Sequence, residues 1–135
     1  MKLLNISVAL FLSILLSSGA SAMTFIQISL STQTMHVKSS RGTFIWPVST
    51  ARPGYRTPRG TFSPKSMKRM HYSSKYDNSP MPYSIFFSGG YSIHGSYAIS
   101  TLGQPVSHGC VRLSPAHAAQ LYDMVRSEGG DITIR

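Results

Sequence analysis

The stretch Ser107-His108-Gly109-Cys110-Val111-Arg112-Leu113 guides the interpretation of the whole chain, because it holds the only cysteine among 135 residues. One histidine stands two positions before this cysteine, and another, in Ile93-His94-Gly95, lies 16 positions upstream. A thiol becomes an effective nucleophile when a nearby base takes its proton. The spacing therefore predicts Cys110 as a nucleophile, with a base on a neighbouring strand.

The N-terminus has the pattern of a secretory signal peptide. Lys2 is followed by a largely apolar run over 3–16 and by the small-residue cleavage site Ala20-Ser21-Ala22. The apolar run is shorter than the roughly 18 to 20 residues that a membrane span requires. We therefore expect a signal peptide over 1–22, a single catalytic domain over 23–135 with no transmembrane span after cleavage, and export to the periplasm or cell envelope.

An unpaired cysteine is informative in an exported chain, because such chains usually use their cysteines in disulfides. Cys110 has no partner within the sequence. A buried structural thiol and an intermolecular disulfide are the alternatives to a reactive thiol. The histidines and glycines around Cys110 favour the reactive thiol.

The strongly basic composition limits the classes of partner. The net charge is +9, or +8 once Lys2 is removed. Such a charge favours an anionic surface such as nucleic acid, a membrane or an acidic cell-wall polymer, although it can also serve solubility alone. Because the chain carries an export signal, we expect no nucleic-acid partner.

Residue patterning predicts a mainly β, α+β domain. Alternating apolar and polar residues predict strands over 24–30, 35–38 and 43–49, with Pro47 at an edge or bulge. Further strands are expected from Phe62 and over 85–87, 91–94 and 131–135. Prolines and glycines predict an irregular loop over 50–61. We expect a long loop over 64–82, forming a lid or channel wall, with a short helix as the alternative.

One helix is expected directly after the cysteine motif. Ser114 is a suitable N-cap and Pro115 a suitable first residue. Apolar residues then recur at helical spacing until Gly129-Gly130, which predicts the helix end. His117 is expected on the surface of this helix.

The neighbours of Cys110 suggest separate chemical roles. His94 is the candidate base. Gly95 and Gly109 lack a β-carbon, so the backbone can approach a substrate there, and the amides over 108–110 could face an oxyanion. Arg112 projects from the same strand face as Cys110 and could bind a carboxylate, or it could be an exposed strand charge.

We expect no metal and no cofactor at this site. The candidate ligands are His94, His108, Cys110 and His117, and zinc sites usually need two closely spaced pairs. Only His108 and Cys110 are closely spaced.

The motif residues resemble the signature of the L,D-transpeptidase (YkuD-like) catalytic domain. The resemblance rests on 93–95 and 107–113, and features of the opening hairpin, 47–50, 57–62 and 81–83 occur in the order typical of that family. It covers nearly the whole chain after the signal peptide. It implies a β-sandwich-type domain with a helix after the catalytic motif, acting on peptidoglycan stem peptides. We expect the protein to be a monomer.

The resemblance also implies a role for each site residue. Cys110 would attack a tetrapeptide stem, release D-alanine and form a thioester, which the amine of another stem resolves into a 3-3 cross-link. His94 would be the general acid and base, and His108 with Gly109 would shape the oxyanion site and support the thiolate. Ser107 would orient His94 or the loop. The substrate contacts would come from Arg112, which would hold a carboxylate, and from Tyr83, which would line the pocket.

Several related activities fit the same motif. Water as acceptor would give an L,D-carboxypeptidase, a free D-amino acid would give exchange, and a lipoprotein lysine would give attachment or release. Carbapenems would acylate the thiol in each case. A non-catalytic peptidoglycan-binding protein and a sortase-like transpeptidase are more distant alternatives.

Overall fold

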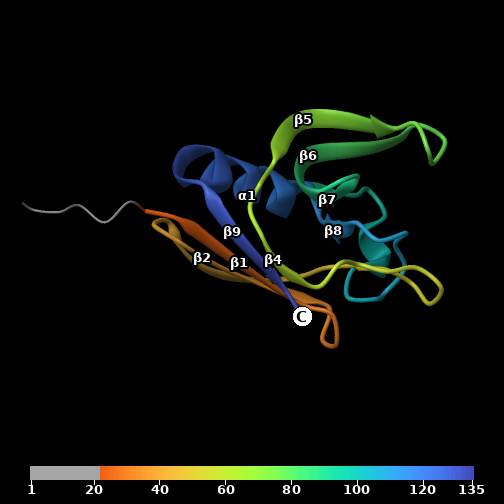
Figure 1. Ribbon diagram of the computed structural model, residues 1–135, viewed down its shortest axis with the longest axis horizontal. Coiled ribbons are helices and arrows are strands. Elements are labelled where there is room, and N and C mark those ends of the chain that lie inside the picture. Colours follow the sequence, from red (N-terminus) through yellow and green to blue (C-terminus); the bar gives the residue numbers. More distant parts are fainter. Residues whose placement is uncertain (1–21) are drawn as a thin grey trace, which may run out of the picture.

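Two β-sheets and one long helix make up the described part of the chain, residues 22–135, in a computed structural model (Figure 1). The predicted signal peptide, apart from its last residue, lies outside the described residues. The mainly β fold with a single α-helix near the C-terminus confirms the predicted fold class.

The first sheet has five strands in the order β3-β2-β1-β9-β4. Its strands are β1 (Thr24–Ser29), β2 (Thr34–Ser39), β3 (Gly42–Pro47), β4 (Gly60–Phe62) and β9 (Gly130–Ile134). The hairpin of β1 and β2 is the one that the alternating sequence predicts, with Ile26 and Ile28 buried and Phe25 exposed. Strand β9 runs parallel to β1 and lies beside it in Figure 1.

The second sheet has four strands in the order β5-β6-β7-β8. They are β5 (Ser66–Ser73), β6 (Ser79–Ser88), β7 (Tyr91–Gly95) and β8 (Val111–Leu113). The first three are antiparallel, whereas β8 is parallel to β7. This parallel pairing sets His94 opposite Arg112.

The prediction of a long loop over 64–82 is wrong, because these residues form most of the β5–β6 hairpin. Strand β5 is at the edge of the sheet and most of its side chains are exposed, so it lacks the alternation of a half-buried strand. Its turn uses Asp77 and Asn78 with positive φ angles of 53° and 52°. Asparagine and aspartate tolerate this conformation better than most residues.

The helix α1 (Pro115–Glu128) begins and ends where the sequence predicts. The Ser114 side chain accepts a hydrogen bond from the amide of His117 at 3.2 Å. Gly129 ends the helix with φ of 78°. A short 3₁₀-helix, η1 (Ile99–Thr101), interrupts the connection between β7 and β8.

The hydrophobic core joins both sheets to α1. It contains buried side chains from β1, β2, β6, β7, β8, β9 and the helix, including Ile28, Phe87, Ile93, Leu121 and Ile132. Because strand side chains alternate, burial of Val111 and Leu113 leaves Arg112 and the preceding Cys110 on the opposite face of the second sheet. Within residues 22–135, no helix is long and apolar enough to cross a membrane.

Candidate active site

A cavity of about 660 Å³ opens over the second sheet. Its lining includes five of the eight predicted site residues, Cys110, His94, His108, Ser107 and Arg112. The remaining walls come from the β5–β6 hairpin and from the segment before η1. The fold thus brings a histidine from β7 and the cysteine motif before β8 into one space.

The sulfur of Cys110 has two polar neighbours. The Ser92 hydroxyl donates to Cys110 Sγ at 3.7 Å, and Cys110 Sγ lies 3.8 Å from the carbonyl oxygen of Gly90. Cys110 is partly exposed, whereas Ser92 is fully buried. Ser92 is not among the predicted site residues. Its position two residues before His94 on one strand was the available signal, because such residues share a face.

His94 is buried, with 6% of its surface exposed. Its Nδ1 lies 2.7 Å from the carbonyl oxygen of Gly95, so Nδ1 carries the proton that it donates. Nε2 is therefore the nitrogen that can accept a proton. Burial, with smaller contributions from the charges of Arg112 and His71, lowers the pKa of His94 to about 4, although the Gly95 carbonyl opposes this shift. His94 is thus neutral at neutral pH, the state in which Nε2 can accept a proton.

Ser107 holds the turn that presents the cysteine. Its hydroxyl donates to the carbonyl oxygen of Cys110 at 2.7 Å and accepts from the amide of Gly109 at 3.0 Å. Ser107 therefore organises the loop, and no hydrogen bond joins it to His94 within the described residues. Because the Gly109 amide is already used, the amides of His108 and Cys110 are the remaining candidate donors for an oxyanion.

A second contact fixes the same turn from the loop between β3 and β4. Thr57 Oγ1 donates to the carbonyl oxygen of Gly109 at 2.9 Å and accepts from the amide of Ala51 at 3.0 Å. Backbone hydrogen bonds join Ser49 and Arg112 in both directions, at 2.8 and 3.1 Å. The 49–57 segment therefore supports the cysteine motif along its length.

The two glycines of the predicted site are needed for close packing. A β-carbon on Gly109, whose φ is 135°, would lie 2.6 Å from Cε1 of Tyr91 and 2.8 Å from the carbonyl oxygen of Arg56. A β-carbon on Gly95 would lie 3.0 Å from Cγ of Pro82 and 3.1 Å from Cα of Pro115. Gly95 thus lets α1 approach β7 closely, while its carbonyl fixes the orientation of His94.

His108 belongs to an aromatic cluster at the rim of the cavity. Its ring stacks on Tyr76, with centroids 4.0 Å apart, and meets Tyr55 edge-on at 4.9 Å. Arg52 lies over Tyr55 and Lys75 over Tyr76. Partial burial, followed by the charges of nearby arginines and Lys75, lowers the pKa of His108. His108 therefore links the turn of the β5–β6 hairpin to the 50–61 loop.

The charge of the cavity favours an anionic ligand. Lys75 and Arg112 line it, whereas none of the chain's four acidic residues does. Burial lowers the pKa of Arg112, and the charge of Cys110 acts in the opposite direction, so these two groups are electrostatically coupled. A substrate carboxylate would find positive charge on two sides.

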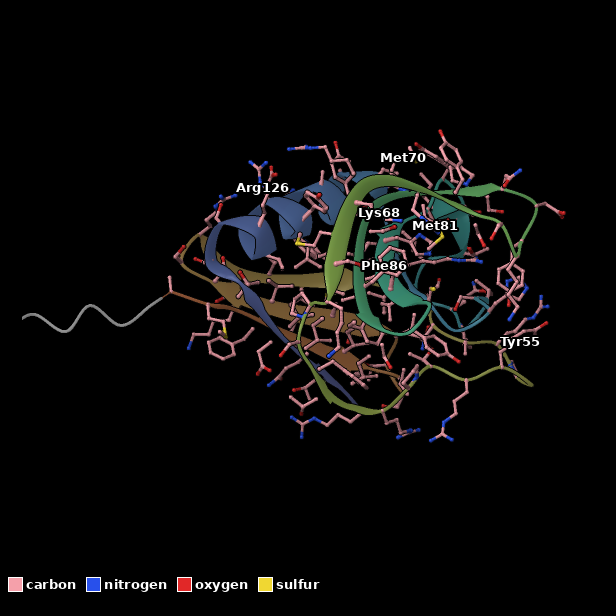
Figure 2. The ribbon with its side chains drawn as sticks, turned by 45° about the horizontal axis from the view of Figure 1, so that its top comes forward. Tyr55, Lys68, Met70, Met81, Phe86 and Arg126 are labelled. Atoms are coloured by element: carbon pink, nitrogen blue, oxygen red, sulfur yellow. The ribbon has the colours of Figure 1, made fainter. Side chains whose placement is uncertain are left out.

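Tyr83 does not line the cavity, contrary to the prediction. Its ring meets that of Tyr122 edge-on at 5.6 Å, against helix α1. Its φ of 53° interrupts the regular alternation of β6. As a result Met81 and Phe86, five positions apart, both line the cavity. Figure 2 labels both side chains on β6.

His117 lies outside the cavity lining. Its ring is half-buried and stacks on Trp46 with centroids 4.7 Å apart. Burial lowers the pKa of His117. Across residues 22–135, no three histidine, cysteine or acidic side chains are arranged to hold a metal ion.

Comparison with known families gives one match over almost the entire described chain. A model of the L,D-transpeptidase catalytic domain, YkuD, matches residues 23–134. No curated protein sequence matches the chain at a significant level.

Solved structures agree with this match. An L,D-transpeptidase from Mycobacterium smegmatis is 26% identical with a TM-score of 0.75, and LD transpeptidase LdtMt1 in complex with imipenem is 25% identical with the same score. Each comparison covers 84% of this chain and 59% of the other. The L,D-transpeptidase of Xylanimonas cellulosilytica is 28% identical with a TM-score of 0.71, over 87% of this chain and 62% of the other. The chain thus spans about three fifths of the length of these structures.

Proposed function

Because the chain belongs to the YkuD family of L,D-transpeptidase catalytic domains, we propose that it is a peptidoglycan L,D-transpeptidase with Cys110 as nucleophile and His94 as base. One observation carries the proposal: Cys110 shares a basic cavity with a buried histidine whose Nδ1 is committed to the Gly95 carbonyl. This arrangement leaves Nε2 to take the thiol proton. A stem peptide, which bears carboxylates, suits the positive charge of Lys75 and Arg112.

The first half-reaction is acylation of the sulfur. His94 Nε2 takes the proton of Cys110 as the sulfur attacks the carbonyl carbon that precedes the terminal D-alanine of a tetrapeptide stem. The amides of His108 and Cys110 stabilise the developing oxyanion. The C–N bond then breaks, the proton on His94 passes to the leaving amine, and a thioester remains.

The second half-reaction transfers the acyl group. The side-chain amine of a diamino acid in a neighbouring stem attacks the thioester, and His94 accepts its proton. The C–S bond breaks, and Cys110 recovers a proton from His94. The product is a 3-3 cross-link, and neither half-reaction changes the oxidation state of any atom.

The defining experiment follows the products formed from purified disaccharide-tetrapeptide monomers by mass spectrometry. The protein is expected to release D-alanine and form cross-linked dimers, and Cys110→Ala is expected to form none while keeping its circular dichroism spectrum. Tripeptide monomers as the only product would replace the proposal with an L,D-carboxypeptidase. Turnover by Cys110→Ala would exclude Cys110 as the nucleophile.

Incubation with imipenem gives an independent test of the thiol. LdtMt1, which is 25% identical, has been solved in complex with this carbapenem. We expect intact-mass analysis to show one covalent adduct, located on Cys110, and none on Cys110→Ala. A fold that only binds peptidoglycan would give no adduct on either protein.

We further propose that the protein works in the periplasm or cell envelope, where its substrate lies. The support is the signal-peptide pattern of residues 1–22. Fractionation of cells expressing the whole chain tests this. We expect the processed protein, beginning near Met23, in the envelope fraction, and unprocessed protein in the cytoplasm would contradict it.

A further inference from the structure

The buried hydroxyl of Ser92 donates a hydrogen bond to the sulfur of Cys110, and the mechanism proposed above gives this hydroxyl no role. Ser92 is fully buried on β7, in the middle of the second sheet. Its oxygen lies 3.7 Å from Cys110 Sγ, and within residues 22–135 this is the only hydrogen bond of its side chain. Burying a hydroxyl without a partner is costly, so its proton is directed at the sulfur.

The other polar neighbour of the sulfur has the opposite character. The carbonyl oxygen of Gly90 lies 3.8 Å from Cys110 Sγ and can only accept. It therefore favours the protonated thiol, whereas the Ser92 hydroxyl can donate to the thiolate. The two polar neighbours of the sulfur thus favour different protonation states: the Gly90 carbonyl favours the thiol, and the Ser92 hydroxyl favours the thiolate.

His94 does little to stabilise the thiolate as a charged partner. Its burial keeps it neutral near neutral pH, so a preformed thiolate–imidazolium pair is disfavoured. Arg112 is coupled to Cys110 by charge, but it is also available to a substrate carboxylate. A fixed neutral donor that no substrate displaces could therefore stabilise the thiolate, and the Ser92 hydroxyl is such a donor.

We propose that Ser92 stabilises the reactive thiolate of Cys110 by donating its hydroxyl hydrogen bond to the sulfur. The hydroxyl keeps its own proton throughout, while the thiol proton passes to His94. The role rests on the proposed use of Cys110 as nucleophile. It adds Ser92, as a third group, to the nucleophile Cys110 and the base His94. It extends the active site to a strand position that lies outside the cysteine motif.

The test measures thiolate formation directly, without peptidoglycan. Iodoacetamide alkylates the thiolate, forming a C–S bond and releasing iodide, and Cys110 is the only cysteine. The alkylation rate is measured from pH 5 to 10 by intact mass. In Ser92→Ala we expect the midpoint of the rate profile to move up by about one pH unit, the size of one hydrogen bond to a charged group.

At pH values well below both midpoints, the alkylation rate is expected to fall by less than the thiolate population. A tenfold loss of thiolate is partly offset because a more basic thiolate is more nucleophilic, which leaves about a three- to fourfold decrease. On muropeptides, the same change is expected in the acylation rate, with little change in KM, because Ser92 contacts the sulfur and does not line the cavity.

Ser84→Ala is the matched control. Ser84 is equally buried, lies on the adjacent strand β6 and donates its hydroxyl to the carbonyl oxygen of Met81 at 2.7 Å. Among the described residues, it makes no hydrogen bond to the sulfur. We expect its alkylation profile to coincide with that of the unmodified protein, which separates a lost hydrogen bond to sulfur from the loss of any buried hydroxyl.

A second pair keeps the test decisive if Ser92→Ala does not fold. Ser92→Thr and Ser92→Val have nearly the same shape and differ in one hydroxyl. The threonine variant is expected to keep the original midpoint and the valine variant to show the shift. Identical profiles for the two, or for Ser92→Ala and the unmodified protein, would overturn the proposal.

The outcomes also separate this inference from the proposed function. A shifted alkylation profile in a protein that never cross-links stem peptides would support the role of Ser92 and refute the transpeptidase assignment. An unshifted profile in a protein that does cross-link them would leave the function standing and refute the role of Ser92.

Discussion

Acidification from pH 7 to pH 5 is expected to destabilise the fold through His94. Burial holds the pKa of His94 at about 4, against 6.5 for an exposed histidine. The unfolded chain therefore binds a proton that the folded chain rejects between these two values. Stability is fully present above about pH 6.5 and decreases as the pH falls toward 4.

The size of the effect follows from the shift. The difference of about 2.5 pKa units corresponds to about 3.4 kcal/mol at 1.36 kcal/mol per unit, once His94 would be protonated in both states. About 2 kcal/mol of this is lost between pH 7 and pH 5. Because His94 is 6% exposed, solvent screens little of the effect.

Urea denaturation at pH 7 and pH 5 measures this loss. A slope of about 1.5 kcal/mol per molar urea makes the lost stability about 1.3 M in the unfolding midpoint. Burial also lowers the pKa of His108 and His117, so both contribute to the total pH dependence. His94→Gln removes only the contribution of His94, and we expect its stability to decrease by about 2 kcal/mol less than that of the unmodified protein over the same interval.

The comparison is insensitive to any direct destabilisation by glutamine, because each protein is compared with itself at two pH values. Equal losses in the two proteins would refute the reasoning. They would mean that His94 is solvated enough to titrate normally, so that burial does not hold its pKa below 6.5.

Three further predictions concern the turn around the cysteine and the helix that follows it. Gly109→Ala is expected to lower the melting temperature and abolish imipenem acylation, because its β-carbon would meet Tyr91 at 2.6 Å; an unchanged adduct yield would contradict this. Thr57→Val is expected to destabilise the protein by about 1 to 3 kcal/mol in urea, since the Gly109 carbonyl and the Ala51 amide both lose a partner. Ser114→Ala is expected to cost about 1 kcal/mol through the lost helix cap, measured in the same way, with imipenem acylation retained; loss of acylation in a folded protein would show that the cap also positions the site.

Local patterns were sufficient where one residue type determines one local structure. The cap at Ser114 and the glycine after α1 marked a helix that the structure confirms to the residue. Alternation of apolar residues likewise identified the β1–β2 hairpin, because one of its faces is buried. Both signals act over a few residues and require no knowledge of the rest of the fold.

The missed features depend on contacts between distant segments. Strand β5 has solvent on much of its surface, so its sequence carries no burial pattern and predicts a loop. The positive φ of Tyr83 turns its ring toward α1, which no local pattern revealed. The spacing of Ser92 and His94 indicates a shared strand face, but the contact of Ser92 with Cys110 depends on the parallel pairing of β7 and β8.

The parallel pairing of β1 with β9 joins the first described strand to the last. β9 lies between β1 and β4, so the first sheet stays incomplete until residues 130–134 have been synthesised. Contacts between the two ends of a chain close late, because they require the largest loop closure. A growing chain therefore contains Cys110 before the first sheet can close, and we expect the thiol to become reactive only after β9 has paired with β1.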